Sequence, residues 1–209
     1  MIIKMGLYIA VIAIGYLIGS INFSVILSRK MAGFDLREKG SKNAGTTNML
    51  RTVGKKGAAI VLFLDILKGV IAVLIARLIS GDVNQAIACQ LSAIAVVLGH
   101  TYPIFFEFKG GKGVATSIGV LLVLNWQIGL ICLVYGIFMI ILTRMVSLGS
   151  ITAAILFPVL TIFIRGHYIA TGFNYIIFGF VMATLVLFNH RTNIKRLNDG
   201  TENRISFKK

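Results

Sequence analysis

Residues 99–117 read GHTYPIFFEFKGGKGVATS and place a glycine-rich loop between two apolar segments. The loop contains Lys109, Gly110, Gly111, Lys112 and Gly113. Glycines let backbone N–H groups converge where a Cβ would interfere, and the start of the following helix adds unpaired N–H donors and the positive end of a helix dipole. With two lysine charges, these features predict a phosphate site at a membrane surface. The alternative is a turn between helices whose lysines only orient the chain.

The composition of the chain indicates its class. Of the 209 residues, 57% are hydrophobic and only 13% are charged, and the mean hydropathy is +0.89. A soluble domain of this length is far more polar, so we predict an all-α, polytopic membrane protein that forms one integral-membrane domain over residues 1–209. The formal charge of +14 does not indicate nucleic acid, because the basic residues are confined to short loops between apolar runs. Anionic lipid headgroups and anionic substrates are the expected partners.

Seven apolar segments are candidates for membrane spans. A spanning helix needs about 20 mostly apolar residues. The candidate segments cover residues 6–27, 58–79, 85–106, 114–124, 127–143, 147–164 and 169–188. The fourth is too short to cross the bilayer fully, so we expect a half-helix or a tightly packed helix there. A merged span over residues 114–143 is the alternative and gives six spans.

The positions of lysine and arginine predict the orientation in the membrane. Most of the 21 such residues fall in the first loop, the glycine-rich loop, the turn after residue 143 and the tail after residue 188. Seven spans put all of these segments on one side, with the N terminus outside and the C terminus in the cytoplasm. Six spans would separate the tail from the glycine-rich loop. The N-terminal apolar run resembles a signal peptide, but no small-residue cleavage site ends it, so we expect an uncleaved first span.

The loop after the first span carries a second candidate anion site. Its centre, residues 40–51, reads GSKNAGTTNMLR and interleaves small, hydroxyl and amide side chains with Lys42 and Arg51. Such a run supplies many hydrogen-bond donors, and the arginine fork fits a phosphate. The alternative is a solvated connecting loop. Its predicted position on the same side as the glycine-rich loop favours the anion site.

Two shorter motifs lie on the same predicted side. The tail from residue 189 reads NHRTNIKRLNDGTEN, and His190 and Asn193 in it share a face if the helix continues. A histidine at a helix end is also often structural. Residues 143–150, TRMVSLGS, offer Ser147 and Ser150 as hydrogen-bond donors. Alternatively, a serine there caps a helix.

Several other chemistries are excluded by the residues present. The glycine-rich loop is not a nucleotide-binding P-loop, because Lys112 is followed by Gly113 and Phe106 stands where the first glycine of that motif belongs. The acidic residues are too few and scattered to hold a metal. Two of the charged side chains, Asp65 and Lys68, fall inside the second span three residues apart, so we expect a buried ion pair between them.

The three motifs together resemble a known enzyme family. GSKNAGTTNMLR, GHTYPIFFEFKGGKGVATS and NHRTNIKRLNDGTEN, with DILKG at residues 65–69, are similar to the motifs of the acyl-phosphate-dependent glycerol-3-phosphate acyltransferases. These are bacterial inner-membrane enzymes at the start of phospholipid synthesis. The resemblance implies transfer of an acyl group from acyl phosphate to the 1-hydroxyl of sn-glycerol 3-phosphate, without a metal or another cofactor. It also implies an active site on the cytoplasmic side.

The same resemblance implies roles for individual residues. Ser41 and Arg51 would hold the glycerol phosphate, with Asn43 as a further substrate-binding residue. The amides of Gly110, Gly111 and Gly113 would hold the acyl-phosphate end. Lys112 would bridge the anionic groups. His190 and Asn193 would position the reacting groups, and Ser147 or Ser150 would assist. A soluble enzyme that makes acyl phosphate is a possible partner on the basic face.

A membrane transporter or channel for an anionic metabolite is the alternative function. It would use the short fourth segment as a broken helix, with Asp65 and Lys68 in the pathway. A transporter carries polar residues through its full depth and often has an internal repeat. In this sequence the polar residues gather on one predicted side and no repeat is visible, which favours the enzyme.

Overall fold

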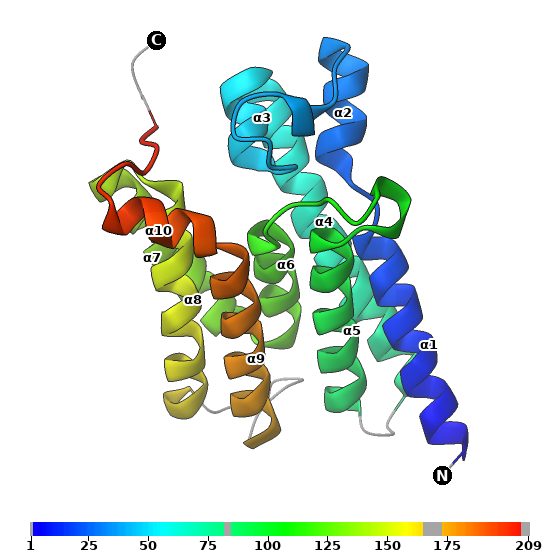
Figure 1. The fold of residues 1–209 in the computed structure, drawn as a ribbon. Helices are drawn as coiled ribbons and strands as arrows, with labels where there is room; N and C mark the ends of the chain where they lie inside the picture. The colour runs from blue at the N-terminus through cyan, green and yellow to red at the C-terminus, as the bar shows by residue number, and fades with distance from the viewer. Residues whose placement is uncertain (1, 82–84, 165–172, 206–209) are drawn as a thin grey trace. The chain divides into compact units, whose positions relative to one another are not determined.

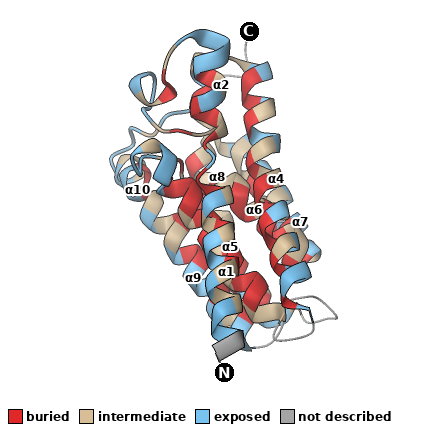
Figure 2. Ribbon diagram, turned by 90° about the vertical axis from the view of Figure 1, so that its right-hand side faces the viewer, coloured by how far each residue is buried: buried red, intermediate tan, exposed pale blue. Residues whose placement is uncertain are grey.

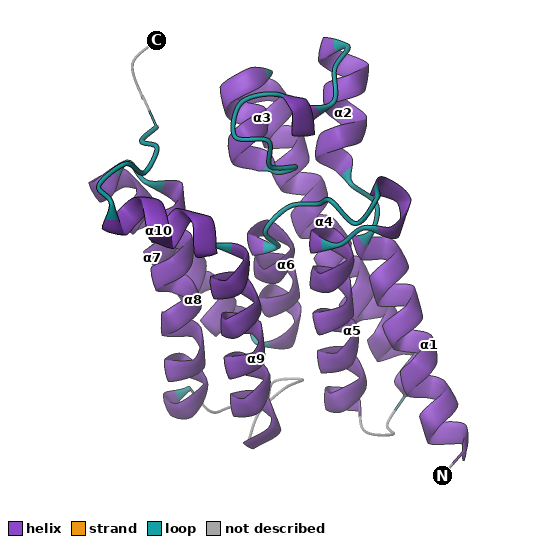
Figure 3. Cartoon of the chain, viewed as in Figure 1, coloured by secondary structure: helices purple, strands orange, loops and turns teal. Residues whose placement is uncertain are grey.

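The computed structural model describes residues 2–81, 85–164 and 173–205. These residues form helices joined by turns, and none of the described residues is in a strand (Figures 1 and 3). They group into two compact units, Met1–Leu124 and Asn125–Lys209. The prediction of an all-α protein is confirmed.

The first unit is built around three long helices. Its elements are α1 (Ile2–Gly19), α2 (Phe23–Ala32), the short 3-10 helix η1 (Leu36–Glu38), α3 (Thr46–Thr52), α4 (Lys55–Ser80), α5 (Gln85–Thr101), the 3-10 helix η2 (Ile104–Phe106) and α6 (Val114–Leu124). Helices α1, α4 and α5 pack against one another, and α6 packs on α4 and α5 (Figure 1). The two motif loops follow α2 and α5, so this packing positions both.

The second unit is a helical hairpin extended by a third and a fourth helix. Its elements are α7 (Trp126–Thr143), α8 (Val146–Phe163), α9 (Phe173–Asn189) and α10 (Arg191–Asn198). Helix α8 packs against both α7 and α9. Phe157, Tyr175 and Phe178 join α8 to α9 with ring centroids 5.7 to 6.0 Å apart. Burial of these aromatic rings contributes to the stability of the unit.

The helices are apolar enough for a multi-pass membrane protein. Among the described residues, five stretches are long and apolar enough to cross a membrane, or six if the bent pair α9 and α10 counts as one. Large apolar side chains such as Phe63, Leu78 and Phe163 are exposed on the helix surfaces. Figure 2 shows buried and exposed residues on different sides of the same helices. Exposed apolar sides of this kind suit a lipid environment.

The first predicted span lies within one candidate span, Lys4–Ala32, but the helix in it is interrupted. Residues 6–27 were expected to form one helix, but α1 ends at Gly19 and α2 begins at Phe23. The side chain of Asn22 caps α2 by accepting hydrogen bonds from the N–H of Val25 at 3.2 Å and the hydroxyl of Ser24 at 2.8 Å. An asparagine that satisfies a new helix start competes with continuation of the old helix. Hydropathy does not register this break.

The fourth segment is a short, tightly packed helix, as predicted. Helix α6 has 11 residues, about 16 Å at the usual helical rise, against a hydrocarbon core of about 30 Å. A Cβ on Gly69 of α4 would collide with the carbonyl oxygen of Thr116, and one on Gly119 of α6 would collide with that of Ile66. Two glycines therefore bring the backbones of α4 and α6 into contact. Residues 114–143 do not form one continuous helix, because α6 ends at Leu124 and Asn125 caps a new helix, α7.

The other predicted spans lie within two or three residues of helices or candidate spans. The span predicted over residues 85–106 coincides with the candidate span Gln85–Phe106, in which α5 ends at Thr101 and η2 follows. Residues 169–172 of the last predicted span lie outside the described residues. Cys89 and Cys132 are both free and buried.

Candidate functional site

The glycine-rich loop folds back on the end of α5. The N–H of Gly110 donates to the carbonyl oxygen of Thr101 at 3.0 Å, and the N–H of Gly111 donates to that of His100 at 3.1 Å. The last carbonyls of a helix lack partners within the helix, so the loop satisfies them. Gly113 has a φ of +82°, which favours glycine. The N–H groups of Gly110 and Gly111, predicted to hold an anion, are therefore engaged with the end of α5 in this structure.

Gly111 brings the two motif loops of the first unit into contact. A Cβ at this position would lie 2.6 Å from the carbonyl oxygen of Ala44 and closer still to Nε2 of His100. No side chain fits between these groups. The loop of residues 40–45 therefore lies directly against the glycine-rich loop. These residues are separated by more than sixty positions in the chain.

The first motif loop is organised by Asn48, a residue that the sequence analysis did not single out. Its side-chain amide donates to the carbonyl oxygens of Leu36 and Lys39, both at 3.0 Å. Its Oδ1 accepts the N–H of Ser41 at 2.9 Å. Asn48 is buried, whereas Ser41 is exposed. A fully hydrogen-bonded buried amide holds the loop so that Ser41 faces outward.

Apolar residues on both sides of this loop give it a small core of its own. Leu36, Met49, Ala58 and Val61 are buried together. The helix α3 that follows the loop carries Arg51 on an exposed face, and Asn43 is half-buried before it. The segment is therefore not an open solvated loop, which was the alternative interpretation.

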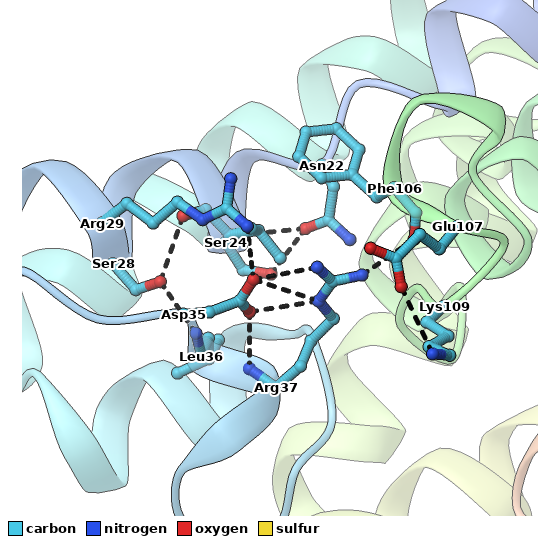
Figure 4. A network of polar contacts seen from close by, with 11 residues as sticks. Asn22, Ser24, Ser28, Arg29, Asp35, Leu36, Arg37, Phe106, Glu107 and Lys109 are labelled. Atoms are coloured by element: carbon cyan, nitrogen blue, oxygen red, sulfur yellow. Dashed lines mark hydrogen bonds and ion pairs between the residues drawn. The ribbon is translucent and has the colours of Figure 1, made fainter.

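A charged network ties the first motif loop to the glycine-rich loop (Figure 4). Asp35 accepts hydrogen bonds from Arg29 at 2.7 Å and from Nε and Nη2 of Arg37 at 2.9 to 3.3 Å. Nη1 of Arg37 donates to the carbonyl oxygen of Phe106 at 2.8 Å. Hydrogen bonds from Arg37 hold the pKa of Asp35 well below its usual range, and the carboxylate in turn raises the pKa of Arg37. Both groups remain charged at neutral pH.

The start of α6 offers polar groups beside the loop. Lys112 is half-buried just before the helix. The hydroxyls of Thr116 and Ser117 are buried and have no hydrogen-bond partner among the described residues. Buried hydroxyls without a partner are uncommon and indicate a missing ligand or water. They lie in the first turn of a helix, where backbone N–H groups also lack intrahelical partners.

His190 marks a bend in the second unit. Helices α9 and α10 meet there at 64°, so the helix does not continue straight through His190, which was the condition for His190 and Asn193 to share one helix face. His190 is buried at the N-cap position, just before α10, and its Nδ1 lies 2.8 Å from the carbonyl oxygen of Val186. Because a carbonyl oxygen only accepts, Nδ1 carries the proton, and Nε2 holds the lone pair in the neutral ring.

Glu202 positions Asn193. Nδ2 of Asn193 donates to Oε1 of Glu202 at 2.9 Å, and Nε of Arg196 donates to Oε2 at 3.0 Å. Burial would raise the pKa of Glu202, but hydrogen bonds from Asn193 and Arg196 outweigh it and lower the pKa. The carboxylate therefore ties the segment after α10 back to that helix. The tail motif contains this glutamate, but its partners are nine and six positions away and were not predicted.

The two serines of the second unit lie on α8. The residue that precedes the first turn of α8 is Met145, so the alternative in which a serine caps this helix is wrong. Ser150 is buried and donates to the carbonyl oxygen of Val146 at 3.0 Å. Ser147 is buried beside Glu202.

The predicted site residues thus form two groups. The first unit contains Ser41, Asn43, Arg51, Gly110, Gly111, Lys112 and Gly113, on two loops that touch. The second unit contains Ser147, Ser150, His190 and Asn193. In the part of the chain that the structure describes, no three His, Cys, Asp or Glu side chains gather in a way that would hold a metal ion.

Comparisons with known proteins agree with these motifs. Residues 9–200 match the family model described as glycerol-3-phosphate acyltransferase. A glycerol-3-phosphate acyltransferase of Thermoanaerobacter pseudethanolicus is 47% identical over 93% of this chain and 94% of its own. One from Clostridioides difficile is 42% identical over 97% of each chain.

Two solved structures share the fold. Both are crystal structures of PlsY (YgiH), an integral membrane glycerol 3-phosphate acyltransferase. The glycerol 3-phosphate form has a TM-score of 0.84 and 39% identity, and covers 95% of this chain and 96% of that one. The lysophosphatidic acid form has a TM-score of 0.82 and 36% identity over 95% of each chain. The chain belongs to the glycerol-3-phosphate acyltransferase family and is an acyltransferase.

Proposed function

We propose that this protein transfers an acyl group from acyl phosphate to the 1-hydroxyl of sn-glycerol 3-phosphate. The hydroxyl oxygen bonds to the acyl carbon, the bond from that carbon to the phosphate oxygen breaks, and 1-acyl-sn-glycerol 3-phosphate and inorganic phosphate leave. The observation that carries the proposal is the contact of Gly111 with Ala44, which joins two phosphate-suited loops in a chain of this family. The reaction needs sites for two phosphorylated substrates.

In this proposal the first motif loop binds the acceptor. Ser41, Asn43 and Arg51 hold the phosphate of glycerol 3-phosphate. The fixed position of Ser41 through Asn48 and the exposed guanidinium of Arg51 support this assignment. A guanidinium presents a planar fork that matches two phosphate oxygens.

The glycine-rich loop binds the donor. Gly110, Gly111 and Gly113 allow the phosphate of acyl phosphate to approach the backbone. The N–H groups and the hydroxyls of Thr116 and Ser117 at the start of α6 supply donors. Lys112 bridges the two anionic substrates. Phosphate is a good leaving group, so positioning and anion stabilisation supply most of the rate.

The tail motif positions the reacting groups. His190 and Asn193 act on the hydroxyl and the acyl carbonyl, with Ser147 and Ser150 in supporting roles. The lone pair on Nε2 of His190 and the Glu202 contact of Asn193 support this assignment. Two candidates accept the hydroxyl proton, His190 and a substrate phosphate.

We further propose that residues 1–209 act as one domain with seven spans. The N terminus lies outside, the C terminus and the active site are cytoplasmic, and the host membrane is the bacterial inner membrane. The family match through both units supports the single domain, and the basic loops support the orientation. The acyl chains of donor and product lie in the bilayer, and a soluble enzyme that makes acyl phosphate docks on the basic face.

A donor-choice assay tests the proposed function. Purified protein in detergent is given glycerol 3-phosphate with acyl phosphate, with the matching acyl-CoA, or with no donor. Lysophosphatidate is expected only in the reaction that contains acyl phosphate as the donor. Product from acyl-CoA at the same rate would contradict the donor assignment. Anion uptake by proteoliposomes without any product would support the transporter instead.

A further inference from the structure

Three charged or ionisable side chains inside the first unit have no role in the proposed reaction. Asp65 and Lys68 on α4 and His100 on α5 are each at most 5% exposed. Nζ of Lys68 lies 3.0 Å from Oδ1 of Asp65, so the predicted ion pair is confirmed. Charges at this depth are costly and are usually retained for a function. We therefore asked what these side chains hold in place.

Lys68 fixes the break between α1 and α2. Besides Asp65, its ammonium group donates to the carbonyl oxygens of Gly19 and Ile21, both at 3.0 Å. These carbonyls are released where α1 ends. Two donors of the ammonium group therefore bond to backbone carbonyls, while its contact with Asp65 is an ion pair.

His100 lies between Asp65 and the glycine-rich loop. Its Nδ1 lies 3.5 Å from Oδ1 of Asp65. The opposite edge of the ring, at Nε2, lies against Gly111, at a point where any Cβ would collide. The backbone oxygen of His100 accepts the N–H of Gly111. The imidazole is therefore held between the buried carboxylate and the loop backbone.

We propose that Asp65, Lys68 and His100 are positioning residues. They hold the backbone of the glycine-rich loop in place at the end of α5. The ion pair fixes the carboxylate, the carboxylate orients the imidazole, and the imidazole supports Gly111 and, through it, the contact with Ala44. The effect on catalysis rests on the proposed function, whereas the effect on the loop does not.

The alternative is an ion pair that only packs α4. An ion pair of that kind is replaceable by apolar residues at little cost. Here the pair also has two partners at the helix break and one on α5, so its replacement removes support for two loops. The two interpretations differ in whether loss of the cluster loosens residues 109–113.

The test compares His100→Leu with Ser92→Ala. Ser92 is a matched control, because its buried hydroxyl also joins α5 to α4, donating to the carbonyl oxygen of Ala72 at 3.0 Å. Hydrogen exchange of residues 109–113 and kcat/KM for acyl phosphate are measured in the full-length detergent-purified protein. His100→Leu is expected to speed exchange in this segment about tenfold or more. It should lower kcat/KM by about tenfold to a hundredfold. Ser92→Ala should change neither.

Each other outcome has a defined meaning. Faster exchange with unchanged kcat/KM would uphold the positioning role and contradict the proposed use of the loop in catalysis. Lost activity with unchanged exchange, or no change in either, would overturn the inference. If His100→Leu does not fold, the double variant Asp65→Asn with Lys68→Met, which leaves no unpaired charge, takes its place. Wild-type exchange and kcat/KM in that variant, or its failure to fold, would also overturn the inference.

Discussion

Nη1 of Arg37 donates a hydrogen bond of 2.8 Å to the backbone oxygen of Phe106, while Asp35 holds the rest of the guanidinium. This bond joins the segment after α2 to the segment before the glycine-rich loop. Arg37 is only 16% exposed, so its position is well defined. We infer that Arg37 keeps the two motif loops together at the edge of the site.

Arg37→Ala should therefore lower activity without a direct contact to substrate. We expect kcat/KM to fall about tenfold, because a small displacement of a binding loop has a large effect on rate. The control is Arg29→Ala, which also removes a partner of Asp35 but does not reach Phe106. Equal losses in the two variants would show that the charge on Asp35 matters rather than the bond to Phe106.

Lys112→Ala should abolish acyl transfer in a protein that still folds. The lysine is assigned to both substrate phosphates, and loss of one preorganised charge in a site of this kind lowers kcat by about a hundredfold or more. Steady-state rates and the melting temperature Tm in detergent measure the two effects. Lys30→Ala, at the exposed end of α2, should keep wild-type turnover. Turnover near wild type in Lys112→Ala would remove this lysine from the site.

Arg51→Ala should change the KM of only one of the two substrates. The KM for glycerol 3-phosphate should rise about tenfold or more, because a charge-assisted bond to phosphate is lost. The KM for acyl phosphate should stay the same. Arg51→Lys should recover only part of the loss, since an ammonium group lacks the guanidinium fork. An unchanged KM for glycerol 3-phosphate would assign this arginine to another role.

His190→Ala should slow the reaction by about a hundredfold if its Nε2 accepts the hydroxyl proton. In that case the wild-type rate should fall as the pH is lowered, because protonation of the ring removes the lone pair. The measurement is kcat/KM against pH for both proteins. A flat wild-type profile would assign the proton to a substrate phosphate instead.

Glu202→Gln should weaken the fold in a pH-dependent way. The folded pKa of Glu202 is lowered, so its carboxylate adds stability above its ordinary pKa of about 4.3. That stability is lost as the pH falls through the folded value. The difference in Tm between wild type and variant should be largest near neutral pH and should become small at acidic pH. The exposed Glu38→Gln should change Tm little; a gap for Glu202→Gln that widens in acid would contradict this account.

The sequence predicted helix positions well where apolar runs end in strong signals. The short helix α6 was predicted correctly because Gly113 and Asn125 mark its two ends in the sequence. The break at Asn22 was missed, because apolar residues still dominate around Ser20, Asn22 and Ser24, and because the partner of the break, Lys68, lies far along the chain. Hydropathy measures transfer to lipid, whereas a helix break depends on which groups satisfy the released carbonyls.

The site was predicted at the level of motifs rather than contacts. The residue types of the two loops indicated phosphate, and the charge asymmetry indicated a common side. The contact of Gly111 with Ala44 and the support of Asn193 by Glu202 were not predictable, because each depends on backbone geometry set by the packed helices. Asn48 gave no signal of its own in a run already rich in polar residues.

The stoichiometry of the reaction tests the central claim most directly. Purified protein is incubated with acyl phosphate and glycerol 3-phosphate, and lysophosphatidate and inorganic phosphate are quantified together. The account predicts equal amounts of the two products, both dependent on glycerol 3-phosphate and both lost in Lys112→Ala. Phosphate release without lysophosphatidate, or no turnover of acyl phosphate by folded wild-type protein, would contradict it.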